Sequence, residues 1–176
     1  MLFSDRSLWT MLHGLVLSGG ALLLLLVALF SFRVMAAPEG DIVPARQSNA
    51  FAWATVAAAT LLWLSVLGGT YIVFPMYRAT PPEGIASLVE YPRALLMSSA
   101  DTRWLHAFAM EIKEHMPWIA AMLATATAFI ARRHRATLLS DASLRRVTGS
   151  LLAIAIVLVS FVALLGVFVN KVAPVW

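Results

Sequence analysis

Cysteine is absent from this chain of 176 residues. Disulfide bonds, thiolate metal sites and cysteine nucleophiles are therefore excluded. The sequence also lacks a glycine-rich phosphate-binding loop, a Gly-x-Ser-x-Gly elbow and a paired-histidine zinc motif. A self-contained hydrolase or nucleotide-dependent enzyme is thus disfavoured, and we expect no catalysis by this chain alone.

Charged residues are scarce, at 12% of the chain, whereas 61% of the residues are hydrophobic and the mean hydropathy is +0.84. A soluble protein of this size has no means of burying so much apolar surface. Because a hydrocarbon core of about 30 Å requires about 20 helical residues, four apolar runs are long enough to cross a membrane. The sequence predicts an all-α integral membrane protein, a four-transmembrane-helix bundle that forms one membrane domain over residues 1–176. The expected spans are approximately 8–32, 51–76, 104–131 with an outer extension before about residue 113, and 147–170.

The orientation follows from the loops. The loop 132–146 has a single acidic residue, Asp141, against five arginines: Arg132, Arg133, Arg135, Arg145 and Arg146. By the positive-inside rule this loop is cytoplasmic. An even number of spans then places both termini and the loop 78–103 on the outer side, which is the periplasm if the membrane is a bacterial inner membrane. The net charge of +4 has the same topological origin, so it does not imply nucleic-acid binding.

Details of two segments can also be predicted. The outer loop 78–103 mixes apolar and charged residues, so it is a candidate interfacial segment, after which Asp101 or Thr102 caps the third helix. In that helix, small residues recur every fourth position at Ala120, Ala124 and Ala128, which favours close helix packing.

Aromatic residues near the ends of the spans fit interfacial anchors: Trp9, Tyr77, Trp104 and Trp176.

Histidines mark a candidate site near the outer face. His13 precedes Arg33 by 20 residues and His115 precedes Arg132 by 17, which places the two histidines about 30 and about 26 Å above the inner surface at a rise of about 1.5 Å per residue. Imidazoles at matched depth on two helices suit the axial positions of a b-type haem. His106 is the alternative ligand, but it is nine residues before His115, on another face of the helix and further out.

Further candidates lie in the same layer. Glu111 shares a helix face with His115, so its carboxylate is a candidate for orienting the imidazole. Together with Glu114 and Tyr71, it is also a candidate for handling protons or a quinone. A metal held by the histidines and carboxylates is disfavoured, because Lys113 is available to pair with the acids. The alternative to all of these is a structural polar cluster whose long side chains reach water.

These observations leave three hypotheses of function. The first is a membrane subunit of a larger respiratory or photosynthetic electron-transfer complex, with haem b bound by His13 and His115. The second is a cofactor-free accessory subunit that stabilises such a complex. The third, less favoured hypothesis is a transporter or channel component. Transport requires a polar path through the bundle, and the inner halves of the spans show none. Because the loops are short, the expected partners are other membrane subunits and lipids, with a quinone or a periplasmic electron carrier as the exchange partner.

Overall fold

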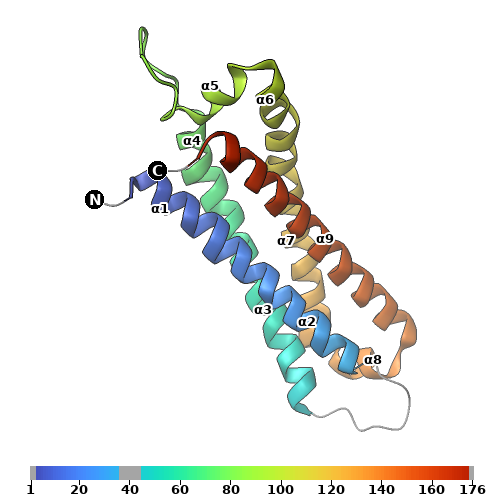
Figure 1. The fold of residues 1–176 in the computed structure, drawn as a ribbon. Helices are drawn as coiled ribbons and strands as arrows, with labels where there is room; N and C mark the ends of the chain where they lie inside the picture. Colours follow the sequence, from blue (N-terminus) through green and yellow to red (C-terminus); the bar gives the residue numbers. More distant parts are fainter. Residues whose placement is uncertain (1–2, 36–44, 175–176) are drawn as a thin grey trace.

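The computed structural model describes residues 3–35 and 45–174, and every regular element within these ranges is a helix. The described residues form four long helical stretches, which pack against one another in a bundle (Figure 1). The first comprises α1 (Asp5–Met11), η1 (Leu12–Gly19) and α2 (Gly20–Met35), and the second comprises α3 (Ala45–Gly68), η2 (Gly69–Val73) and α4 (Phe74–Tyr77). The third comprises α6 (Ala100–Trp104), η3 (Leu105–Met110) and α7 (Glu111–Arg133), and the fourth is α9 (Ala142–Val172). The short helices α5 (Pro92–Met97) and α8 (Arg135–Ser140) lie in the connections.

Long helices that are consecutive in the sequence pack against each other in the bundle. The most extensive packing joins α2 to α3, α3 to α7 and α7 to α9, and α9 also contacts α2. Both chain ends lie at the end of the bundle that carries α4, α5 and α6, here called the terminal end (Figure 1). The opposite end carries α8 and the arginines of residues 132–146, and is here called the arginine end.

The helix boundaries extend the predicted spans. Three described helices are long and apolar enough to cross a membrane, Asp5–Met35, Ser48–Tyr77 and Ala142–Val172, as expected of a multi-pass membrane protein. The third long helix is not among them; its α7 segment begins with Glu111, Lys113 and Glu114 and ends with two arginines.

The connections hold more helix than the sequence indicated. The loop 78–103 contains α5 and the start of α6, and the basic loop contains α8. The predicted cap of the third helix, Asp101 or Thr102, is wrong. The helix is capped by Ser99, whose side chain accepts a hydrogen bond from the Asp101 amide. At the other connection, Asp141 caps α9 by accepting from the amides of Ser143 and Leu144. The predicted anchor Trp176 lies outside the described residues.

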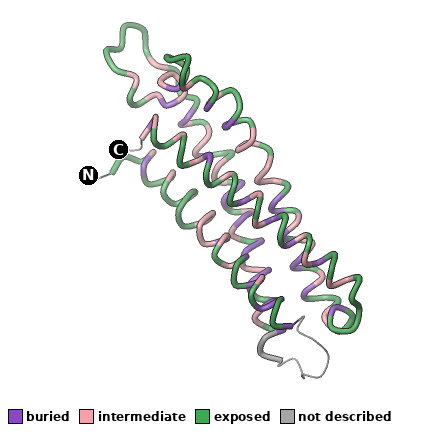
Figure 2. Tube along the Cα trace, turned by 45° about the vertical axis from the view of Figure 1, so that its right-hand side comes forward, coloured by how far each residue is buried: buried purple, intermediate pink, exposed green. Residues whose placement is uncertain are grey.

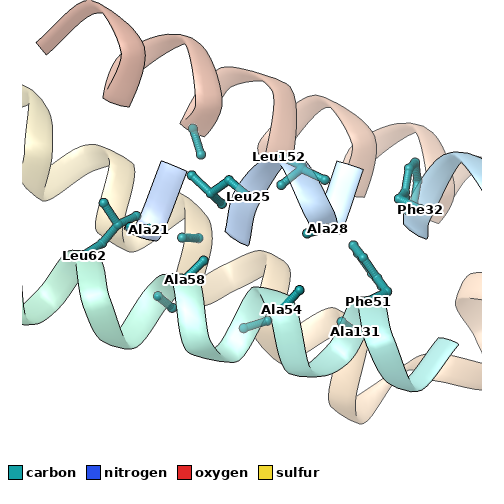
Figure 3. Packing of buried hydrophobic residues seen from close by; sticks show 14 of the residues in the cluster. Ala21, Leu25, Ala28, Phe32, Phe51, Ala54, Ala58, Leu62, Ala131 and Leu152 are labelled. Atoms are coloured by element: carbon teal, nitrogen blue, oxygen red, sulfur yellow. The ribbon is translucent and has the colours of Figure 1, made fainter. Parts of the chain in front are cut away.

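Small residues form the centre of the bundle. The predicted stripe of Ala120, Ala124 and Ala128 is buried against the other helices. They belong to one buried cluster with alanines and a few large side chains of the neighbouring helices, part of which is drawn in Figure 3: Ala21, Ala28, Ala54, Ala58, Leu25, Leu62, Leu152 and Phe51. Alanines allow the helix backbones to approach closely, which matters in lipid, where apolar side chains gain little by leaving their surroundings. Buried residues accordingly recur along one side of each long helix, and the remaining sides are exposed (Figure 2).

At the terminal end, Arg6 of the first helix contacts two other segments of the chain. Arg6 pairs with Glu90 at 3.8 Å and donates to the carbonyl oxygens of Val89 and Pro174. One guanidinium therefore joins the first helix, the loop 78–91 and the end of the fourth helix.

Candidate functional site: the histidine layer

Three π-helical segments surround one part of the bundle, toward the terminal end. Segment η1 contacts α3, segment η2 contacts α1, and α9 contacts both η1 and η3. In a π-helix the hydrogen bonds span five residues instead of four, which is rare and frequent at functional sites. Each segment carries one of the predicted site residues: His13 in η1, Tyr71 in η2 and His106 in η3.

His13 is wedged between the first and second helices. Its Nδ1 lies 3.0 Å from the carbonyl oxygen of Ser65 and 3.1 Å from the Ser65 hydroxyl. Because a carbonyl oxygen only accepts, Nδ1 carries the proton in the neutral ring, and Nε2 keeps its lone pair. The ring occupies a notch that only glycine leaves open, since a Cβ at Gly69 would lie 2.7 Å from His13 Cε1.

Two serines complete the surroundings of His13. The hydroxyl of Ser18 donates to the His13 carbonyl oxygen at 3.0 Å, and it lies 2.7 Å from the hydroxyl of Ser65. The polar groups of the first helix are thus paired with those of the second. This is the arrangement that a structural polar cluster requires in an apolar bundle.

Lys113 points into the bundle. A Cβ at Gly166 of α9 would lie 3.1 Å from its Nζ, so the ammonium group reaches across to the fourth helix. Among the described residues Lys113 has no ion-pair partner, so it is not paired with the neighbouring acids as the sequence suggested.

His115 lies on the outside of the bundle. Its ring is exposed, and its Nδ1 donates to the carbonyl oxygen of Glu111 at 2.8 Å. The group that orients the imidazole is therefore the main chain of Glu111, and not its carboxylate as expected. His13 sits between the first two helices whereas His115 faces outward from the third, so the described contacts do not bring the two imidazoles together.

His106 has a partner that sequence reasoning missed. The Tyr77 hydroxyl lies 2.8 Å from His106 Nδ1, and this hydrogen bond joins the end of the second helix to η3. Burial is the main cause that lowers the pKa of His106 below its ordinary value; Arg93 lowers it further, and Glu114 and Glu111 oppose the shift. Tyr77 was expected to be a membrane anchor, and no spacing signal relates it to a histidine 29 residues away.

Tyr71 stands apart from the acids with which it was grouped. Its side chain is 71% exposed and lines a groove of about 410 Å³ between the first and second helices. The other lining residues are nearly all apolar: Trp9, Leu17, Leu64, Leu67, Gly68 and Ile72. Within the described ranges, no three His, Cys, Asp or Glu side chains are grouped closely enough to hold a metal ion.

Comparisons with known proteins returned no matching family model, no matching curated protein and no matching solved structure.

Proposed function

We propose that the chain crosses a bacterial inner membrane four times, with α7 as the remaining span and with the terminal end outside. Two observations support the fourth span: α7 packs along both α3 and α9, which are parts of apolar helices, and its 23 residues measure about 35 Å at the helical rise. The arginines at the opposite end support the orientation by the positive-inside rule.

Within that membrane we propose that the chain is a subunit of a larger electron-transfer complex of the respiratory or photosynthetic type, and that the third helix packs against a neighbouring subunit. The observation that carries the proposed packing against a neighbour is an exposed stripe along α7 formed by Glu111, His115, Ile119, Met122 and Phe129. The stripe is polar at its first two positions, and polar groups facing lipid are costly. A protein partner that covers His115 and Glu111 removes this cost.

The polar cluster around His13 supports a stabilising role more than a catalytic one. The Nδ1 of His13 and the hydroxyls of Ser18 and Ser65 already have partners inside the chain. The function that the geometry favours is therefore that of a cofactor-free accessory subunit.

Ligation of haem b is the second candidate function. One observation favours it: both His13 and His115 use Nδ1 for a backbone carbonyl oxygen, the arrangement that leaves Nε2 for iron. The positions of the rings weigh against a single haem held by both, because His13 is enclosed by Ser65 and Gly69 and His115 faces outward.

A native gel of membranes solubilised in mild detergent tests the subunit proposal. We expect Ile119→Trp, on the α7 stripe, to release the chain from an assembly that also contains redox-active subunits. Leu23→Trp is the matched control, since Leu23 is equally apolar and 66% exposed but lies on the first helix. Equal behaviour of the two variants, or migration of the wild-type chain alone, contradicts the proposal.

A further inference from the structure

A polar hollow lies at the arginine end of the bundle, far from the histidine layer. It encloses about 260 Å³ between the beginning of the second helix and the end of the third. Its lining combines two arginines with an aromatic and an amide side chain: Asn49, Ala52, Trp53, Ala131, Arg132 and Arg135.

The basic groups of this hollow are held in position by the second helix. The guanidinium of Arg132 lies 4.7 Å from the centre of the Trp53 ring, within the range of a cation–π interaction. Arg135 donates from Nη1 to Oδ1 of Asn49 at 2.6 Å. A guanidinium that stacks on a ring keeps its N–H donors at the edge, where they can bind an anion with two parallel hydrogen bonds.

Among the described residues, the charge around the hollow is mainly positive. Residues 132–146 contain five arginines and one acid, Asp141. The Asp141 carboxylate is occupied at the start of α9, where it accepts from two backbone amides. An anion in the hollow would therefore face an excess of positive charge.

We propose that the hollow binds the phosphate of an anionic phospholipid, with Arg132 as its ligand. The position favours a lipid over free phosphate, because Trp53 lies five residues inside the apolar segment Ser48–Tyr77 and is 63% exposed. An exposed tryptophan at that depth contacts the glycerol and upper acyl region of a lipid whose headgroup reaches the arginines. This site does not depend on the proposed electron-transfer function.

The test compares lipids on the detergent-solubilised full chain. Phosphatidylglycerol, phosphatidylcholine and inorganic phosphate are each titrated while the melting temperature is measured, since a ligand that binds the folded state raises it. We expect only phosphatidylglycerol to stabilise the wild-type chain. Arg132→Gln should weaken the apparent affinity about fivefold, the effect of losing one arginine beside an anionic lipid.

Arg133→Gln is the matched control. Arg133 is the exposed neighbour of Arg132, its loss changes the net charge equally, and it does not line the hollow. Its affinity for phosphatidylglycerol should stay within about twofold of the wild-type value, because charge that acts at a distance is screened.

Several outcomes overturn the proposal. Equal stabilisation by phosphatidylcholine means that the hollow does not select an anion. Equal stabilisation by inorganic phosphate means that no lipid is needed. If Arg132→Gln and Arg133→Gln lose the same amount of affinity for phosphatidylglycerol, the lipid is attracted by the whole basic end and not by the hollow. If Arg132→Gln does not fold, the comparison of the three ligands on the wild-type chain still decides the proposal.

Discussion

The notch that holds His13 gives a sharp prediction about two adjacent glycines. Gly69→Ala places a Cβ 2.7 Å from Cε1 of His13 and 3.2 and 3.3 Å from its two nitrogens. The ring must then move away from Ser65, to which it is bound at 3.0 Å. Gly68→Ala is the matched control, because a Cβ at Gly68 meets no atom within 4 Å.

The magnitudes separate the two variants. At either position the change to alanine favours the helix by about 1 kcal/mol. At Gly69 the gain is outweighed by overpacking, which costs about 1–3 kcal/mol, and by loss of a hydrogen bond worth about 1 kcal/mol. We therefore expect Gly69→Ala to lower the free energy of unfolding by about 1–3 kcal/mol and Gly68→Ala to leave it equal or slightly higher.

Reversible unfolding in mixed micelles, followed by circular dichroism, measures both free energies. A double-mutant cycle identifies the cause: in a His13→Ala background the added methyl group of Gly69→Ala meets no imidazole, so its cost should disappear. If Gly69→Ala is as harmless as Gly68→Ala, or if its cost persists without the imidazole, the placement of His13 in the notch is refuted.

Three further predictions concern the ends and the interior of the bundle. Because burial lowers the pKa of His106 from its ordinary value of 6.5, the unfolded chain takes up a proton before the folded chain does. Unfolding measured from about pH 7 to about pH 5 should therefore show stability falling as the pH drops below about 6.5, and His106→Gln should reduce that slope. Lys113→Met should stabilise the chain by about 1–3 kcal/mol, because it removes an ammonium group that has no ion-pair partner among the described residues; a loss of stability in the same unfolding assay would contradict this. Since the natural chain has no cysteine, a membrane-impermeant maleimide added to intact cells should label Ala86→Cys but not Ala136→Cys, and the reverse pattern would refute the proposed orientation.

Hydropathy predicted the helical membrane architecture, and the structure extends it. Runs of apolar residues can be recognised without knowledge of contacts. Three of the predicted spans therefore match the long apolar helices of the structure, with predicted boundaries up to a few residues inside the observed ones. The observed helices extend further than the predicted spans, to Asp5 at the start of the first and to Val172 at the end of the fourth. A helix continues past its apolar residues until a helix-breaking residue ends it. Spacing alone also predicted the buried alanine stripe of α7.

The contacts of the candidate site could not be predicted in the same way. Counting residues gives the depth of a histidine, but the side of the helix to which it points depends on the π-helical segments, which shift the register of η1 and η3. The inward path of Lys113 depends on the space that Gly166 leaves on another helix. The partnership of Tyr77 with His106 depends on how the loop 78–103 folds back, and no local pattern encodes it.

The most direct test of the central claim, that this chain is a cofactor-free membrane subunit of an electron-transfer assembly, is a spectrum taken after separation. Membranes are solubilised in mild detergent, complexes are resolved on a native gel, and the band that contains the chain is compared with the purified chain by reduced-minus-oxidised absorbance. We expect redox bands in the large complex and a flat spectrum for the purified chain. Haem bands at about one haem per purified chain, lost in His13→Ala or His115→Ala, would contradict it and establish the cytochrome instead.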